Sequence, residues 1–154
     1  MTAPEIATFF AAKVPADWFS GPVRVDSDQD EILCVGPLAA GRAPREFREA
    51  TRAERMAIAQ EAEELYRRKV SWGVEVDGET TVFTTLALPT MTRLRLSERR
   101  ALDTLVEAGV ARSRSDALAW CVRLVGRHQA EWLADLRDAL GSVERVRAEG
   151  PTLL

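Results

Sequence analysis

The sequence predicts an α+β protein, in which an antiparallel sheet with one long helix is followed by a mainly helical part. Residues 44–69 contain no glycine and no proline after Pro44, and they are rich in Ala, Glu and Arg, which is typical of a long helix. Two β-branched runs flank Asp77-Gly78, a pair typical of a type I′ hairpin turn. After Pro89 the pattern changes to one short alternating segment followed by helical periodicity.

The elements of the first part give the order α-β-β-α-β-β. Residues 4–14 are predicted to form a short helix, and two short strands follow at 23–26 and 31–35. After the long helix, residues 70–76 and 80–88 form the predicted hairpin, and Pro89 ends the last strand because proline cannot donate to a ladder. Since hairpins are commoner than crossovers, the strands are expected to form an antiparallel sheet with the long helix on one face.

The elements of the second part are one strand and three helices. The alternation of TRLRL predicts a strand at 92–96, and Ser97 is expected to cap a helix that Gly109 ends. A second helix is expected to start at Ser113, with Asp116 completing an approximate capping box. Gly126 weakens this helix, and a further helix resumes at 128–140 and extends to about Val146. The predicted domains are therefore residues 1–89, 90–126 and 127–148.

Composition excludes several classes of protein. Of the 154 residues, 46% are hydrophobic and 29% are charged, which is typical of a folded globular chain, and no apolar run is long enough to span a membrane. The N-terminal segment lacks the pattern of a signal peptide, and Cys34 and Cys121 lie in apolar runs like reduced core thiols. We therefore expect a cytoplasmic protein. A single histidine, His128, and the lack of a cysteine pair at ligand spacing predict no metal, and no cofactor is expected.

The segment 91–126 resembles the ribbon-helix-helix family of dimeric DNA-binding proteins, the Arc and MetJ type. The resemblance rests on the strand TRLRL, on LDTLVEAG as the first helix and on RSRSDAL at the start of the second helix. In that family two copies pair their strands into a ribbon that enters the major groove of DNA. The resemblance implies a homodimer, whose core would contain Leu102, Leu105, Val106, Leu118, Cys121, Val122 and Val125.

The resemblance also implies which residues contact bases. The outer face of the ribbon would carry Met91, Arg93 and Arg95. An arginine guanidinium there can donate two hydrogen bonds, to O6 and N7 of a guanine. Leu94 and Leu96 would face the core. The segment between the strand and RSRS is shorter than is usual in the family, and a slip of one residue would exchange the two faces. Alternating Arg and Leu in an isolated strand is otherwise typical of a half-solvated sheet edge.

The start of the second helix is the implied phosphate site. Ser113, Arg114 and Ser115 would hold a DNA phosphate there, because hydroxyl donors, free N–H groups and the helix dipole favour an anion. The alternative is purely structural: RSRS only caps the helix, which is the commoner role of such serines.

Four arginines share one face of the predicted long helix. Arg45, Arg48, Arg52 and Arg55 follow one another at steps of three, four and three residues, with Arg42 just before them. The favoured interpretation is a solvated face, paired with the nearby Glu46, Glu49 and Glu54. The alternative is a stripe that binds an anion, a nucleotide or the DNA backbone.

These observations predict a homodimeric, sequence-specific DNA-binding transcriptional regulator, with repression as the family's usual mode. Residues 1–89 would bind a small-molecule effector or another protein. The expected partners of the whole protein are double-stranded DNA and a second copy of the chain. One alternative is an antitoxin-like interaction protein. Another is a ligand-binding α+β protein that uses the ribbon-helix-helix fold only to dimerise. No glycine-rich phosphate loop or nucleophile elbow is present, so the sequence predicts no catalytic residues and no enzyme.

Overall fold

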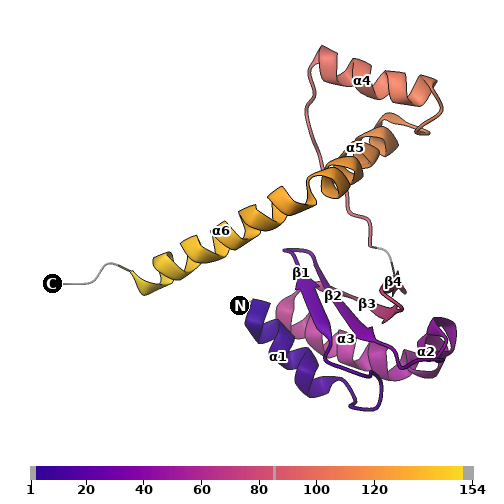
Figure 1. The fold of residues 1–154 in the computed structure, drawn as a ribbon, viewed down its shortest axis with the longest axis vertical. Coiled ribbons are helices and arrows are strands. Elements are labelled where there is room, and N and C mark those ends of the chain that lie inside the picture. Colours follow the sequence, from indigo (N-terminus) through magenta and orange to yellow (C-terminus); the bar gives the residue numbers. More distant parts are fainter. Residues whose placement is uncertain (1–2, 85, 151–154) are drawn as a thin grey trace. The chain divides into compact units, whose positions relative to one another are not determined.

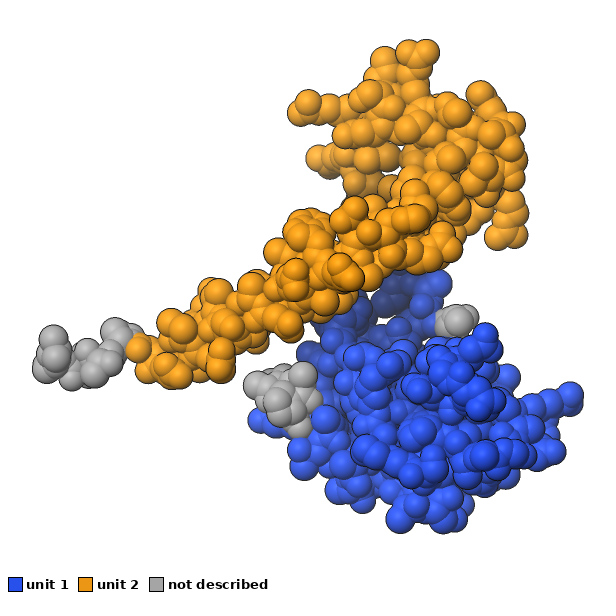
Figure 2. Space-filling model, in the orientation of Figure 1, with its two compact units in different colours: residues 1–89 blue, residues 90–154 orange. Residues whose placement is uncertain are grey.

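The computed structural model describes residues 3–84 and 86–150 and divides the chain into two compact units. Figure 2 shows unit 1, residues 1–89, in blue and unit 2, residues 90–154, in orange. Unit 1 holds a four-stranded sheet with three helices, and unit 2 holds three further helices (Figure 1). The mixed α+β class predicted from the sequence is confirmed.

Unit 1 follows the predicted order of elements, except that the long helix is divided. Its elements are α1 (Ala3–Lys13), β1 (Arg24–Ser27), β2 (Glu31–Pro37), α2 (Pro44–Ala50), α3 (Arg52–Tyr66), β3 (Lys69–Val76) and β4 (Glu79–Val82). The hairpin turn between β3 and β4 is as predicted, because Asp77 and Gly78 both have positive φ angles, 51° and 81°. The predicted strand 80–88 is shorter in the structure, and its residue 85 lies outside the described residues.

The sheet is not wholly antiparallel, which corrects the sequence-based prediction. Its strand order is β1-β2-β3-β4, and the central pair β2–β3 is parallel, with Cys34 opposite Trp72. A parallel pair needs a crossover of a dozen or more residues, and α2 and α3 supply it. The middle of β3 is buried on both faces, from Ser71 to Val74, as expected of a parallel strand.

The predicted long helix is interrupted at Thr51, whose φ and ψ of −99° and 5° leave the helical region. The Thr51 hydroxyl donates to the carbonyl of Phe47 at 2.7 Å, and its oxygen accepts from Arg55 Nε at 2.9 Å. Such bonding of a β-branched hydroxyl to the preceding turn bends helices. Arg67, in the left-handed region with φ 57°, ends α3 three residues before the predicted boundary.

The core of unit 1 lies between the helices and the sheet. Phe10 of α1 is fully buried, and its ring stands edge-on to Trp72 of β3 with ring centroids 5.6 Å apart. Phe19 packs over Gly36, where an added Cβ would lie 2.4 Å from the ring, so this strand position requires glycine. The remaining buried members of the core are Ile6, Trp18, Ile32, Cys34, Leu38, Phe47, Ile58, Ala62, Val74 and Phe83.

Unit 2 consists of α4 (Leu96–Glu107), α5 (Arg114–His128) and α6 (Ala130–Glu149). The predicted strand 92–96 is absent from the chain as described: α4 already begins at Leu96, and residues 91–95 have no partner strand. A strand forms only with a neighbour to hydrogen-bond, and the four strands of the sheet all belong to unit 1. Gly126 does not break α5, which continues to His128.

Within the part of the chain that the structure describes, no helix combines the length and hydropathy needed to cross a bilayer.

Candidate functional site

The residues predicted to contact DNA bases lie at the start of unit 2, in a segment that is neither helix nor strand before α4 begins. Met91 is 94% exposed, and Arg93 and Arg95 are exposed as well. Leu94 is half-buried and packs against the cluster around Leu102. Arg93 and Arg95 thus remain open to solvent on either side of Leu94, whereas Met91 lines a shallow hollow together with Leu102 of α4 and Leu118 of α5. Leu96, expected to face the core, is instead 63% exposed and begins α4.

Two hydrogen bonds fix this segment to α4. The backbone N–H of Arg95 donates to the carboxylate of Glu98, which satisfies a donor at the helix start. The side chain of Arg99 donates to the carbonyl of Leu94. Glu98 therefore has the capping role that the sequence suggested for Ser97, which lies inside the helix.

A glycine-ended turn joins α4 to α5. The N–H of Val110 donates to the carbonyl of Leu105 at 2.9 Å, and the N–H of Gly109 donates to that of Val106 at 3.0 Å, which is a Schellman motif. Gly109 has the positive φ that this motif requires, 74°, as the sequence predicted. Ala111, which follows this turn, packs with Leu102 and Ala117 in the core between α4 and α5, and only 6% of its surface is exposed.

The three residues predicted to bind a DNA phosphate lie at the start of α5, and two of them already form hydrogen bonds within unit 2. Ser113 caps the helix as predicted, since its side-chain oxygen accepts from the N–H of Asp116 at 3.2 Å. Arg114 forms a bidentate ion pair with Asp103 of α4, in which Nε donates to Oδ1 at 2.6 Å and Nη2 donates to Oδ2 at 2.7 Å. Ser115 is exposed. Asp103 was not predicted as a site residue, because a pair eleven positions apart across a turn leaves no pattern in the sequence.

Asp103 and Arg114 predict a pH dependence. The hydrogen bond from Arg114 lowers the pKa of Asp103 from its ordinary 3.8, and the positive charge of Arg114 lowers that pKa further. A carboxylate with a lower pKa in the folded state stabilises the fold above its unfolded pKa and loses that contribution as pH falls through the folded pKa. We expect Asp103→Asn to melt below the wild type at pH 7, and we expect this difference in thermal melts to shrink as the pH falls below 3.8 through the lowered pKa of Asp103. Asp135→Asn, on exposed α6, is the matched control, and a difference independent of pH would contradict the prediction.

Large apolar side chains along α5 and α6 are exposed. No residue of α6 is buried, although the helix has 20 residues. Leu133, Leu136, Leu140 and Val143 follow one another at steps of three, four and three residues, which is the spacing of a coiled-coil seam. The exposed large apolar residues of the two helices are Val122, Val125, Trp132, Leu136, Leu140, Val143 and Val146.

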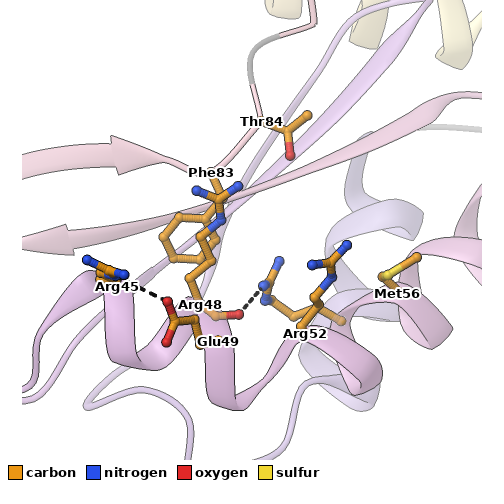
Figure 3. Close-up of a pocket in the computed structure, with 8 residues that line it drawn as sticks. Arg45, Arg48, Glu49, Arg52, Met56, Phe83 and Thr84 are labelled. Atoms are coloured by element: carbon orange, nitrogen blue, oxygen red, sulfur yellow. Dashed lines mark hydrogen bonds and ion pairs between the residues drawn. The ribbon is translucent and has the colours of Figure 1, made fainter.

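The four arginines of the predicted stripe gather around one pocket in unit 1. Arg45 and Arg48 come from α2, and Arg52 and Arg55 come from the first turn of α3. The pocket has a volume of about 630 Å³. Figure 3 shows Arg48 rising beside the ring of Phe83. The other residues that line the pocket are Glu49, Met56 and Thr84.

Arg55 is the buried member of this group, with 7% of its surface exposed. Its Nη2 donates to the carbonyl of Arg48 at 2.7 Å, and its guanidinium lies 4.9 Å from the centroid of the Phe83 ring. Burial lowers the pKa of Arg55, and the positive charges of Arg48 and Arg52 lower it further. Arg55 is thus fixed in place beside two like charges.

The sequence favoured a solvent-exposed face on which these arginines pair with nearby glutamates, and the structure agrees with this only for Arg45. Arg45 pairs with Glu49 at 3.1 Å, and both side chains are largely exposed. Among the described residues, no ion pair joins Glu46 or Glu54 to the stripe, and Arg48, Arg52 and Arg55 form none. Arg42, just before the stripe, lies with its guanidinium 5.2 Å from the centroid of the Phe47 ring.

Both cysteines and two of the tryptophans pack in the cores of the two units. Burial raises the pKa of the Cys34 thiol to about 12, so this cysteine is unreactive at neutral pH. Cys121 is half-buried, and both thiols are free. No cluster of metal-ligating side chains occurs among residues 3–84 and 86–150. Trp18 and Trp72 belong to the core of unit 1.

Comparison with known proteins matches both units. Residues 4–82 match a family model described as the Rv1265-like protein, N-terminal domain, and residues 95–147 match the Mb1296 C-terminal domain. Neither description is that of a ribbon-helix-helix family, so that resemblance rests on the residues quoted above. No solved structure matches the chain significantly.

Relatives of the chain occur in mycobacteria. The chain is 54% identical over 160 aligned positions to the uncharacterised proteins Mb1296 of Mycobacterium bovis and Rv1265 of Mycobacterium tuberculosis. The alignment covers 96% of this chain and 70% of each relative. The N-terminal model alone spans half of the chain. The chain therefore belongs to the family of Rv1265-like proteins.

Proposed function

We propose that this protein is a homodimeric, sequence-specific DNA-binding transcriptional regulator that acts by repression. The observation that carries the proposal is the segment 91–95. It is neither helix nor strand, exposes Met91, Arg93 and Arg95, and leads directly into two helices joined by a tight turn. In the ribbon-helix-helix arrangement, the segment before the helix pair meets its copy and forms a two-stranded ribbon in the major groove.

A second copy of the chain is the partner that this unit requires. The Leu94 carbonyl and the backbone of Arg95 are bonded within unit 2, but residues 91–93 belong to no strand pair of the described chain, and an exposed edge of this kind readily pairs with another strand. The apolar faces of α5 and α6 are uncovered in the same unit, and the seam spacing of α6 suits a second identical helix. A twofold axis would pair both features at once, because each surface then meets its own copy.

The chemistry of the exposed side chains suits DNA. Arg93 and Arg95 carry guanidinium groups that can donate two bonds each to guanine O6 and N7. Arg114 uses Nε and Nη2 on Asp103, so its other N–H groups remain for a phosphate oxygen beside Ser115. Asp103 then orients the phosphate-contacting guanidinium.

The test is a fluorescence-anisotropy titration with DNA fragments from upstream of the protein's own gene, at two salt concentrations. We expect tight, salt-dependent binding by the wild type. The double variant Arg93→Ala/Arg95→Ala is expected to lose sequence preference and about 1–3 kcal/mol for each lost guanine contact. The charge-matched control is Arg127→Ala/Arg145→Ala, on exposed positions of α5 and α6.

Two outcomes would contradict the proposal. Equal losses in the two double variants would mean that bulk charge, rather than the ribbon, holds the DNA. Nonspecific binding by a wild type that remains dimeric would leave unit 2 as a dimerisation device.

A further inference from the structure

We propose that the arginine pocket of unit 1 binds a compact polyanion, such as the di- or triphosphate group of a small phosphorylated ligand. The pocket gathers Arg45, Arg48, Arg52 and Arg55 around a hollow of about 630 Å³, a volume within the range of small-molecule sites. This inference does not depend on DNA binding, because it concerns unit 1 alone.

The charge of the pocket is unbalanced. Four guanidinium groups line it together with one carboxylate, Glu49, which already pairs with Arg45. Arg48 and Arg52 are exposed toward solvent and form no ion pair within the described part of the chain. Like charges held together repel one another, and a bound anion of two or three charges relieves that repulsion.

Arg55 gives the pocket a fixed, buried cation. A buried charge is costly unless it is paired, and the pairs of Arg55 are neutral: the Thr51 hydroxyl, the Arg48 carbonyl and the Phe83 ring. These contacts hold its guanidinium in a set orientation before any ligand arrives. Binding is therefore spared much of the entropy that ordering an arginine side chain usually costs.

A second hollow adjoins the arginine pocket and gives room for an uncharged part of the ligand. It has a volume of about 540 Å³ and shares Arg55, Met56 and Thr84 with the first. Its further lining consists of Gln60, of Glu63, which is paired with Lys69, and of small and apolar residues: Ala53, Ala57, Ala59, Val70 and Trp72. A ligand with a polyphosphate end and a less polar body fits this arrangement better than a bare ion.

The experiment is calorimetric titration of the full chain, without DNA, with inorganic tripolyphosphate and with sulfate at matched ionic strength. We expect saturable one-to-one binding of tripolyphosphate and much weaker binding of sulfate. Arg48→Ala/Arg52→Ala removes two exposed guanidinium groups and is expected to weaken tripolyphosphate binding roughly a hundredfold. The charge-matched control, Arg24→Ala/Arg68→Ala, lies outside the pocket in the same unit and should bind as the wild type does.

Each other outcome overturns the inference. Equal weakening in both double variants, or the lack of saturable binding by the wild type, would show that the pocket is not a polyanion site. If the wild type does not bind tripolyphosphate and Arg48→Ala/Arg52→Ala loses DNA affinity, these arginines contact the DNA backbone instead. Unchanged melting temperatures of both variants establish that the fold is intact in each comparison.

Discussion

Replacing Leu136 and Leu140 by glutamate is expected to halve the mass of the protein in solution, from a dimer to the 17.1 kDa of one chain. Both leucines lie on the exposed seam of α6, where a second copy would bury them. Burial of a leucine contributes about 1.5–3 kcal/mol, and a buried unpaired carboxylate costs more than that gain. Light scattering at micromolar concentration measures the mass, and the same variant should lose specific DNA binding because its ribbon lacks a partner strand.

The matched control for this variant places the same charges on the opposite face of α6. Ala134→Glu/Ser142→Glu adds two carboxylates away from the seam, so it should remain a dimer. A wild type that is monomeric at micromolar concentration would refute the proposed dimer. A seam variant that stays dimeric would place the interface elsewhere.

Phe10→Ala is expected to destabilise unit 1 by about 3–5 kcal/mol, a large fraction of the stability of a typical domain. The Phe10 side chain is fully buried between Phe9 and Trp72, with ring centroids at 5.3 and 5.6 Å. Its removal leaves a cavity in a rigid aromatic cluster, which cannot collapse fully around a smaller side chain.

Urea unfolding followed by tryptophan fluorescence measures this effect. A background with Trp120→Phe and Trp132→Phe restricts the signal to Trp18 and Trp72, both in the core of unit 1. Phe10→Leu is the control and should cost much less, because it keeps most of the buried volume. A midpoint shift for Phe10→Ala no larger than that of Phe10→Leu would mean that α1 does not share the core of the sheet.

Local signals in the sequence predicted the local structure well. Asp77-Gly78 predicted the hairpin turn, since few other pairs accept two positive φ angles. Gly109 and Ser113 predicted the end of α4 and the start of α5, because each supplies the conformation or the oxygen that a helix end requires. These features depend on residues within a few positions of one another.

The errors concern long-range pairing. The parallel pairing of β2 with β3 is set by where α2 and α3 return the chain, and the expectation of hairpins gave the wrong direction. The segment 92–96 alternates like a strand, yet it forms none in a chain that gives it no neighbour. The continuous helix was wrong at Thr51, where a side-chain bond competes with the helix.

The candidate sites show the same division. The spacing of Arg45, Arg48, Arg52 and Arg55 placed them on one face, and the structure brings them around one pocket. The burial of Arg55 was not predictable, because it depends on Phe83, which the sheet brings from far along the chain.

By itself the sequence determined the α+β class, the elements with strong caps and turns, and the arginines that share a helix face. Each follows from periodicity or from the conformational preferences of single residues. The tertiary structure alone decided that Arg55 is buried beside Arg48 and Arg52, and that Arg114 is paired with Asp103. Burial and charge pairing depend on which distant segments meet, and that is settled by packing of the whole core rather than by local preference.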